Sequence, residues 1–335
     1  MMVNDIKKLT QNTKKILVTG VAGFIGSHVA KRLCELGVEV VGIDNLNDYY
    51  DVRLKEWRLE NFLSKFNNFK FIKLDIEDKD ALERIFSEHK FDAVINLAAR
   101  AGVRASLDNP QVYITTNMLG TANLLGLCKK HDVKKFVLAS TSSLYAGKEM
   151  PFDESIPTTT PISPYAASKG GAEGIAYSYH YLYDIDVSIL RYFTVYGPAG
   201  RPDMSIFRFI KWAFEGNHIQ LMGDGTQKRD FTYVDDIADG TIKALKNVGY
   251  EIFNLGGDAP HELVEMISFI EGATGAKLKI DRLPFPKEDM KATWASIEKS
   301  KKMLDWSPKV SFIDGLKKTV DWTRENWEFV KELNI

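Results

Sequence analysis

The sequence predicts an α/β fold in which a doubly wound parallel sheet is joined by a smaller mixed α/β region. Two observations predict it. Short apolar runs alternate with amphipathic stretches from residue 15 to about residue 194. Beyond residue 195 this rhythm gives way to pieces punctuated by glycine and proline. Repeated alternation of strand and helix is typical of a parallel sheet with helices on both faces.

The strands are expected at the apolar runs, and the helices between them. After the first run, Ile25, Val29 and Leu33 recur at the spacing of one helical face. The apolar run at 251–255 predicts one more strand late in the chain. The earlier runs lie at 16–19, 38–43, 69–74, 93–98, 136–139 and 187–192.

The same rhythm divides the chain into two parts. We expect residues 14–194 to form the sheet domain and residues 230–257 to return to it. Residues 195–229 and 258–330 are expected to form the smaller region, packed over the edge of the sheet where ligands bind. Because ligands of parallel sheets bind at the carboxyl ends of the strands, the residues that follow each strand carry most of the functional information.

Composition excludes several classes of protein. The 335 residues include 44 Lys and Arg against 45 Asp and Glu, a net charge of -1. This balance, without blocks of like charge, argues against nucleic acid or an anionic membrane surface as the main partner. No apolar run is long enough to cross a membrane, and the polar start lacks a signal-peptide core. Two cysteines, Cys34 and Cys128, do not make a disulfide framework. A chain of this length buries a core large enough to need no structural metal. Because the sequence shows neither a membrane span nor a signal peptide, we expect a cytoplasmic protein.

Three glycines follow the first predicted strand, in the order Gly20-x-x-Gly23-x-x-Gly26. Gly20 allows a tight turn, Gly23 allows the backbone to approach a pyrophosphate, and Gly26 lets helix and strand pack closely. The phosphates would face the amino terminus of the next helix. Asp44 ends the second strand at the expected distance and can accept hydrogen bonds from a ribose diol. This Rossmann-type pattern predicts NAD rather than NADP, because Asp44 would repel a 2'-phosphate.

Asp75 ends the third predicted strand. It is either a second cofactor contact, to the adenine amino group, or a solvated turn aspartate.

Tyr165-Ala-Ala-Ser-Lys169 opens the helix that follows the fifth strand. A spacing of four places the phenol and the ammonium on one face, one turn apart. A free tyrosine has a pKa near 10, and a nearby ammonium favours its charged form. The spacing alone occurs on many helices. The hydroxyl cluster of Thr141, Ser142 and Ser143, just past the fifth strand, adds a second sign of a catalytic site.

With Asn96-Leu-Ala-Ala99, these motifs make the chain resemble the extended short-chain dehydrogenase/reductases that act on nucleotide sugars. The resemblance extends from residue 15 to about residue 327. Within that superfamily the chain is most similar to the UDP-glucuronate 4-epimerases, through the stretches 47–55, 101–104 and 191–204. The resemblance implies reversible conversion of UDP-glucuronate to UDP-galacturonate through a 4-keto sugar. It also implies a tightly bound NAD that is regenerated in every turnover.

The resemblance implies roles for individual residues. Tyr165 is expected to be the catalytic base, Lys169 to lower its pKa and hold the nicotinamide ribose, and Thr141 to share the proton path. The expected cofactor-binding residues are Gly20, Gly23, Phe24, Ile25, Gly26, Asp44, Asn45, Asp75, Ile76, Leu97, Ala98, Ala99, Asn117, Tyr165, Lys169 and Tyr192. The expected substrate-binding residues are Arg104, Thr141, Ser142, Ser143, Thr194, Arg201, Arg208, Arg229 and Asp289. Of these, Arg201, Arg208 and Arg229 would bind the UDP phosphates, and Asp289 the nucleotide ribose.

A uronic acid poses a hazard, because a ketone at carbon 4 makes the intermediate a β-keto acid that loses carbon dioxide readily. Related decarboxylases carry a glutamate, and the 4,6-dehydratases an Asp-Glu pair, in the loop that here reads Thr141-Ser-Ser-Leu. The neutral hydroxyls of Ser142, Ser143 and Thr194 are expected to hold the carboxylate in the plane of the ring. The carbon–carbon bond that would break is then poorly aligned with the carbonyl π system.

Three alternatives stay open. UDP-glucose/galactose 4-epimerases usually have an asparagine where Thr194 stands, and a UDP-glucuronate decarboxylase would share the first chemical step. A regulatory protein that binds NAD without turnover is disfavoured by the intact Tyr165, Lys169 and Thr141. The chain also departs from the family pattern at Asn96, Arg100 and Ala146. Apolar residues on more than one face of segment 113–128 and of the helix after Tyr165 predict a homodimer.

Overall fold

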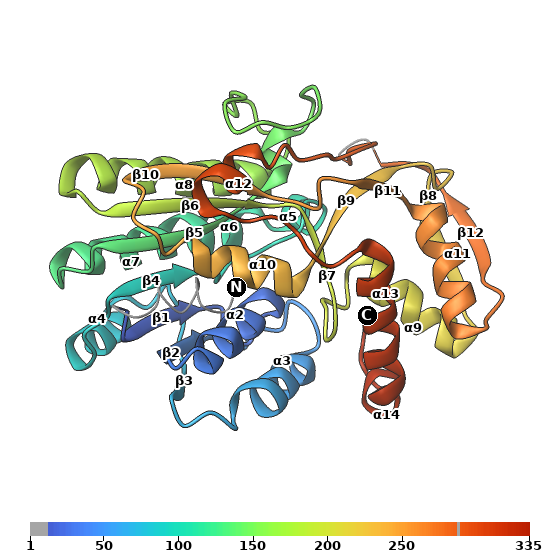
Figure 1. Ribbon diagram of the computed structural model, residues 1–335, viewed down its shortest axis with the longest axis horizontal. Coiled ribbons are helices and arrows are strands. Elements are labelled where there is room, and N and C mark those ends of the chain that lie inside the picture. Colours follow the sequence, from blue (N-terminus) through green and yellow to red (C-terminus); the bar gives the residue numbers. More distant parts are fainter. Residues whose placement is uncertain (1–12, 287–288) are drawn as a thin grey trace.

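A computed structural model describes residues 13–286 and 289–335. Its centre is a seven-stranded sheet in the order β10-β6-β5-β4-β1-β2-β3 (Figure 1). All neighbouring strands in this sheet are parallel. The strands are β1 (Lys15–Thr19), β2 (Glu39–Asp44), β3 (Phe69–Lys73), β4 (Ala93–Asn96), β5 (Lys135–Thr141), β6 (Asp186–Tyr192) and β10 (Tyr250–Leu255). The predicted α/β fold with a doubly wound parallel sheet is confirmed.

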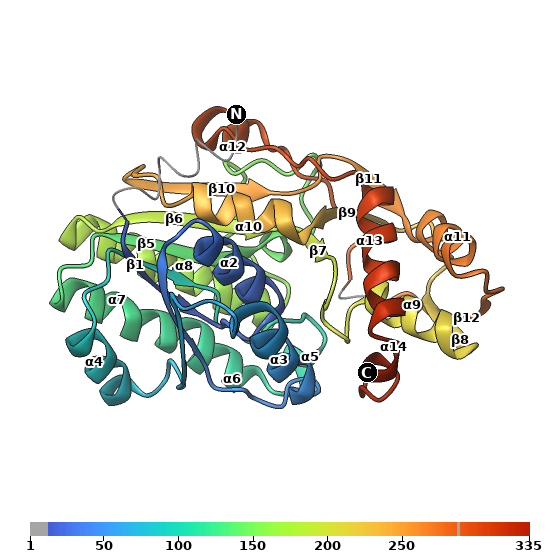
Figure 2. The same cartoon turned by 60° about the horizontal axis from the view of Figure 1, so that its bottom comes forward.

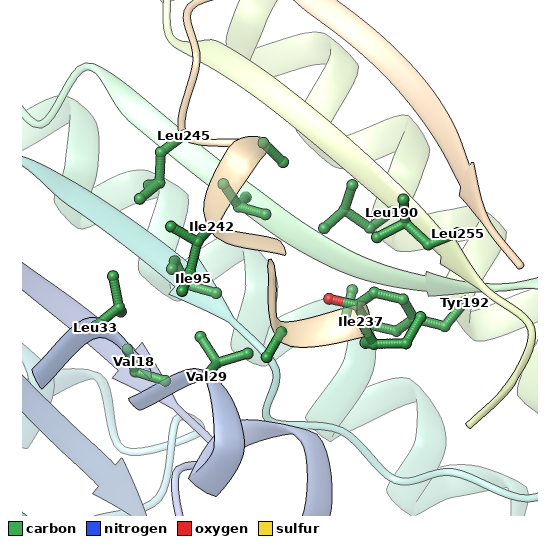
Figure 3. Close-up of a cluster of buried hydrophobic side chains, with 14 of the residues drawn as sticks. Val18, Val29, Leu33, Ile95, Leu190, Tyr192, Ile237, Ile242, Leu245 and Leu255 are labelled. Atoms are coloured by element: carbon green, nitrogen blue, oxygen red, sulfur yellow. The ribbon is translucent and has the colours of Figure 1, made fainter. Parts of the chain in front are cut away.

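Helices cover both faces of the sheet because its strands are apolar on both sides (Figure 2). On one face lie α2 (Phe24–Glu35) and α10 (Val234–Lys243), and on the other lie α4 (Lys79–Glu88), α7 (Gly120–Lys130) and α8 (Pro164–Tyr183). Alternate residues of each strand point to opposite faces: Val18 packs with the first group and Leu17 with the second. Figure 3 shows Val29 and Leu33 of α2 in one apolar cluster with Ile237 and Ile242 of α10.

The chain forms a smaller region, here called the small region, beyond the carboxyl ends of the strands (Figure 1). It contains a three-stranded sheet in the order β11-β9-β7 and a two-stranded sheet of β12 and β8. Its elements are β7 (Thr194–Tyr196), α9 (Ser205–Glu215), β8 (His218–Met222), β9 (Lys228–Tyr233), β11 (Pro260–Glu262), α11 (Leu263–Thr274), β12 (Lys279–Leu283) and α13 (Phe312–Glu325). A separate apolar core, with Ile210, Met266 and Leu316 at its centre, holds these elements together.

The chain passes between the two parts repeatedly. It enters the small region after β6, returns with α10 and β10, leaves again with β11, and comes back to the large sheet with α12 (Glu298–Leu304) before α13. The part of segment 258–330 around α12 therefore packs on the core of the large sheet and not in the small region, where it had been predicted. The predicted return segment 230–257 therefore begins inside the small region, in β9, and reaches the large sheet with α10. The remaining helical segments are α3 (Val52–Arg58), η1 (Leu59–Leu63), α5 (Ala105–Asp108), α6 (Pro110–Tyr113), η2 (Ile114–Leu119), η3 (Ser142–Tyr145) and α14 (Trp327–Val330).

A fully buried arginine, Arg58 at the end of α3, joins the two parts. Its guanidinium donates to the carbonyl oxygens of Ala22 at 3.0 Å, Ala199 at 2.9 Å and Gly200 at 3.0 Å. It also donates to the hydroxyl of Tyr50 at 2.6 Å. The glycine turn after β1 and the loop before α9 are thus held to the same side chain.

No helix in the described ranges is long and apolar enough to cross a membrane.

Candidate active site

A cavity of about 710 Å³ lies where the small region meets the carboxyl ends of the sheet strands. Residues from the turn after β1, the ends of β2 to β6 and the small region line it. All but one of the residues predicted for the cofactor and the substrate are among the lining residues. The sequence-predicted residues are therefore brought together, as the topology of a parallel sheet requires.

The exception is Asn117, which lies outside the cavity lining. Its side-chain amide accepts from the backbone N–H of Arg100 at 2.9 Å and donates to the carbonyl of Arg100 at 3.0 Å. It also donates to Ser168 Oγ at 2.9 Å. Because these bonds occupy the buried amide, Asn117 shapes the segment after β4 rather than lining the cavity as predicted.

The turn after β1 has the close approaches that its glycines were predicted to permit. Gly20 has a φ of 68°, in the left-handed region, and its carbonyl accepts from the backbone N–H of Gly23 at 3.0 Å. A Cβ at Gly26 would lie 2.1 Å from the carbonyl oxygen of Gly20. The turn leads directly into α2, whose amino-terminal N–H groups have no side-chain cap and face the cavity edge. This end suits an anion.

Substituting alanine for Gly26 is expected to weaken cofactor binding. The added methyl group must displace the Gly20 carbonyl, and overpacking of this kind costs about 1–3 kcal/mol. The affinity for NAD should then fall by about tenfold, measured as NAD released on denaturation and by titration calorimetry. Gly272→Ala is the control, since a Cβ there meets nothing within 4 Å. Equal NAD content in the two variants would contradict the assigned role of the turn.

Asp44 is held firmly at the end of β2. Its carboxylate accepts from the backbone N–H of Ala22 at 3.1 Å and of Leu46 at 2.8 Å. The ammonium of Lys55 lies 4.0 Å from the Asp44 carboxylate and donates to the carbonyl of Asn47 at 2.8 Å. Lys55 lines the cavity, and burial lowers its pKa. Sequence reasoning missed it, although the stretch 47–55 had been singled out as a family feature.

The carboxylate of Asp75 is tied to the same corner. It accepts from the side-chain amide of Asn45 at 2.7 Å and from the backbone N–H of Glu77 at 2.9 Å. Both Asn45 and Asp75 line the cavity, so Asp75 is not simply a solvated turn residue.

The end of β5 and the start of α8 hold the predicted catalytic residues. Helix α8 begins at Pro164, behind a Ser163 hydroxyl that accepts from the N–H of Ala166. The Lys169 ammonium donates to the carbonyl of Ala139 at 2.9 Å. Burial of Lys169, which is 4% exposed, lowers its pKa to about 8.

The phenol of Tyr165 lines the same cavity. Burial raises its pKa, whereas contact with the Thr141 hydroxyl and the positive charge of Arg201 act to lower it. The contribution of Lys169 to lowering the pKa of Tyr165 stays a prediction. Thr141 is also fixed from the other side, since its hydroxyl oxygen accepts from the N–H of Ser143 at 3.1 Å.

The substrate end of the cavity is rich in hydroxyls and arginines. Ser142, Ser143 and Thr194 line it, together with Arg104, Arg201, Arg208 and Arg229. Within the described residues no carboxylic acid lies between Thr141 and Tyr145, as the sequence had indicated.

Among the residues that the structure describes, the four arginines have two carboxylate partners, Asp203 and Asp289. Arg201 forms a two-pronged pair with Asp203, at 3.0 and 2.6 Å, and lies over the ring of Tyr49. Asp289 accepts from Arg229 at 2.8 Å and lies 3.5 Å from Arg104. Arg208 lies over the ring of Trp212, and its buried Nε has no hydrogen-bond partner among the described residues. This excess of positive charge favours a ligand that carries about two negative charges.

The three departures from the family pattern fit the structure without strain. Asn96 is buried, accepts from Thr19 Oγ1 at 2.7 Å and donates to Thr121 Oγ1 at 3.0 Å. Ala146 has a φ of -54°, which suits an alanine, and Gly147 takes the positive φ of 80°. Arg100 stands beside the cavity, and its buried Nε has no partner among the residues that the structure describes.

The described ranges contain no cluster of three or more His, Cys, Asp or Glu side chains that could hold a metal ion. For proton transfer the cavity offers the phenol of Tyr165, the ammonium of Lys169 and the hydroxyl of Thr141, next to a glycine turn of the dinucleotide-binding type. Such a site can move a proton to and from an alcohol while a bound dinucleotide exchanges a hydride with the same carbon.

Comparisons with known proteins agree with this arrangement. A sequence model of the NAD dependent epimerase/dehydratase family matches residues 16–256. The chain is 58% identical, over 320 residues, to a UDP-glucuronate 4-epimerase of Thermodesulfobacterium geofontis, covering 95% of this chain and 99% of that protein.

Two solved structures are also similar. One is a UDP-glucuronic acid 4-epimerase of Bacillus cereus in complex with UDP-glucuronic acid and NAD, at 40% identity and a TM-score of 0.87. The other is a UDP-glucose 4-epimerase of Thermotoga maritima with UDP-glucose, at 33% identity and a TM-score of 0.85. Each comparison covers 93% of this chain and 99% of the other.

Proposed function

This chain belongs to the NAD-dependent epimerase/dehydratase family, and from that membership we propose that it is an isomerase that converts UDP-glucuronate reversibly to UDP-galacturonate. One observation carries the proposal. A single cavity is lined by the dinucleotide-type turn and by Tyr165, Lys169 and Thr141, with the uncharged Ser143 and Thr194 at its sugar end. The similarity of the whole chain to a UDP-glucuronate 4-epimerase supports it.

The residues of the cavity fit NAD. The glycine turn leaves space that a Cβ would fill, and the amino terminus of α2 suits a pyrophosphate. Asp44 would hold the adenosine ribose and Lys169 the nicotinamide ribose. When bound, NAD supplies a hydride acceptor and donor at carbon 4 of the sugar.

The protein's own residues would manage the proton. Tyr165 would take the proton of the hydroxyl on carbon 4, with the Thr141 hydroxyl sharing the proton path. It would return the proton to the same oxygen after the 4-keto sugar has turned its other face to the cofactor. Burial raises the pKa of Tyr165, and Arg201 and Thr141 oppose this rise only in part. A phenolate near neutral pH would therefore depend on the positive charges of Lys169 and of the bound nicotinamide. Lys169 would hold a positive charge one helical turn away.

The UDP handle would occupy the arginine-rich part of the cavity. Arg201, Arg208 and Arg229 would contact the two phosphates, and Asp289 would accept from the ribose of UDP. Asp289 would then give up its ion pair with Arg229 to bind the ligand, and this would leave Arg229 available for the phosphates. The small region would thus serve the UDP-sugar, largely as predicted for residues 195–229 and 258–330, and the large sheet the cofactor. The start of the predicted return segment 230–257 lies in β9, on the UDP-sugar side.

The proposal is tested by incubating UDP-glucuronate with the purified protein, without added NAD, and following the sugar by NMR. UDP-galacturonate is the expected product. A UDP-pentose would identify a decarboxylase instead, and turnover of UDP-glucose but not of UDP-glucuronate would identify a hexose epimerase. Denatured protein should release NAD, and failure of both results would overturn the proposal.

Removing the hydroxyls at the sugar end is expected to turn part of the flux into decarboxylation. Ser143→Ala and Thr194→Ala would free the carboxylate to rotate out of the ring plane, which aligns the carbon–carbon bond with the ketone. Each variant should release more carbon dioxide per turnover than the parent, measured as trapped gas and as UDP-pentose. Ser155→Ala, an exposed serine outside the cavity, is the control. If both variants release no more carbon dioxide while still forming the ketone, the planar-carboxylate role is wrong.

We also propose a homodimer that acts in the cytoplasm. Large apolar side chains are exposed along η2 and α8, among them Ile114, Leu119 and Tyr181, the last 73% exposed. A second copy would cover these two helical segments. The two described cysteines are buried free thiols, which suits a reducing compartment.

A further inference from the structure

The face of α8 that carries Tyr165 and Lys169 has a third functional group at the same spacing. Glu173 lies four residues beyond Lys169 and is 6% exposed. Its carboxylate accepts from Ser140 Oγ at 2.5 Å and from Arg191 at 3.0 and 2.7 Å. Neither Glu173 nor Arg191 lines the cavity. The Glu173–Arg191 pair can therefore affect the site only through the residues that it contacts.

Three consecutive residues of β5 hold these three residues of α8. The carbonyl of Ala139 accepts from Lys169 and the hydroxyl of Ser140 donates to Glu173. The hydroxyl of Thr141 contacts Tyr165. A helix that slid or rotated on the strand would break all three contacts together, so Glu173 fixes the register of α8 on β5 at the end away from the cavity.

Arg191 extends this attachment to other parts of the fold. It lies in β6, is 2% exposed, and donates to the hydroxyl of Tyr145 at 2.8 Å. The Tyr145 hydroxyl donates in turn to Asn254 of β10 at 2.8 Å. Asn254 donates to the carbonyl of Phe152 at 2.9 Å. The network thus connects α8 with β6, β10 and the loop that follows the substrate-binding serines.

We propose, on the basis of the function proposed above, that Glu173 is a positioning residue whose carboxylate holds Tyr165 and Lys169 in register with β5 and keeps the Lys169 ammonium charged. Arg191 holds that carboxylate in its orientation through two hydrogen bonds.

The charges around Lys169 support this role. Among the described residues, the charge that acts on Lys169 is that of Glu173, on the same helix. Arg191 of β6 contacts Glu173, and Tyr145 of η3 contacts Arg191. Burial is the largest influence on Lys169 and lowers its pKa to about 8, while the negative charge of Glu173 acts to raise it. Because Lys169 must be protonated to support the Tyr165 phenolate, its working range ends as pH rises through this pKa. Without Glu173 that loss would come at lower pH.

The test is Glu173→Gln, which keeps the shape and removes the charge. The alkaline limb of the kcat profile for UDP-glucuronate should move to lower pH by about one unit. KM should change little, since Glu173 does not line the cavity. Glu173→Asp, which restores the charge, should bring the limb back toward the parent's position.

The matched control is Glu154→Gln. Glu154 is a partly buried glutamate at the far end of the same network, where it accepts from the backbone N–H of Asn254 at 2.7 Å. This variant should keep the parent's limb. An unmoved limb in Glu173→Gln, or equal shifts in the two variants, would overturn the proposal and leave Glu173 a structural role alone.

Two further measurements keep the proposal testable. If Glu173→Gln does not fold, the double variant Glu173→Gln/Arg191→Met removes both buried charges, avoids an unpaired arginine and should show the same shift. The titration of Lys169 can also be followed without turnover, by ¹⁵N NMR of labelled lysine with Lys169→Met as the assignment control. A lower titration midpoint in Glu173→Gln is expected. An unchanged titration midpoint would contradict the role of Glu173 whatever the substrate is. If the unsubstituted protein does not convert UDP-glucuronate, that result contradicts only the proposed function.

Discussion

Replacement of Tyr165 by phenylalanine is expected to lower kcat for UDP-glucuronate by a factor of about a thousand, because general acid–base groups contribute on that order. Phenylalanine keeps the ring and removes only the oxygen that exchanges the proton with carbon 4. The phenol lines the cavity, and no other described side chain there is assigned its proton-transfer role. Epimerisation is measured by NMR under single-turnover and steady-state conditions.

The control for this result is Tyr113→Phe. The ring of Tyr113 lies 6.1 Å from that of Tyr165, between centroids, and is buried, whereas Tyr165 is half-buried. Its hydroxyl donates to the carbonyl of Ala101 and does not line the cavity. Tyr165→Phe should retain NAD and the parent's melting temperature. A loss of activity in Tyr113→Phe as large as that in Tyr165→Phe would show that tight packing, and not proton transfer, sets the rate.

Substituting methionine for Arg58 should lower the free energy of unfolding by about 3–5 kcal/mol, the range for removing one member of a buried polar set. Arg58 is fully buried, and its removal leaves the carbonyls of Ala22, Ala199 and Gly200 without their donor. Chemical denaturation at a fixed NAD concentration gives the difference, since bound NAD itself adds stability.

Arg53→Met on the same helix is the matched control. Arg53 is 49% exposed, and without its guanidinium Asp51 keeps the backbone N–H groups of Arg53 and Asn334 as donors. This variant should therefore lose clearly less stability than Arg58→Met. Equal destabilisation of the Arg53 and Arg58 variants would mean that α3 is sensitive to any substitution, and the bridging role of Arg58 would be wrong.

The arrangement of the large sheet could be predicted from the sequence because its signals are local. Apolar runs separated by helical spacing are enough to place the strands, and a parallel sheet brings their carboxyl ends to one edge. Once the edge is known, Gly20, Asp44 and Tyr165 must lie near one another, although they are far apart in the chain. The prediction needed only the order of the elements, not their detailed contacts.

Partners that depend on tertiary approach could not be predicted in this way. The four acceptors of Arg58 come from three separate stretches of sequence, and nothing in the residues around it signals that it is buried. The pairing of Glu173 with Arg191 joins a helix to the adjacent strand, and Asn117 is placed by the loop after β4. In each case the side chain alone looks like an ordinary polar residue.

The repeated passage of the chain between the large sheet and the small region bears on how new specificities can arise. The residues proposed to bind the sugar and UDP come from η3, β7, α9, β9 and the segment around Asp289, with α10 and β10 of the large sheet between β9 and that segment in sequence. No single cut and exchange of a contiguous block can therefore transplant a complete UDP-sugar pocket from a relative. Exchange of one contiguous block would also replace α10 and β10, so the core of the large sheet would combine elements from two proteins. Substrate preference in this architecture is therefore most readily changed by point substitution inside the cavity.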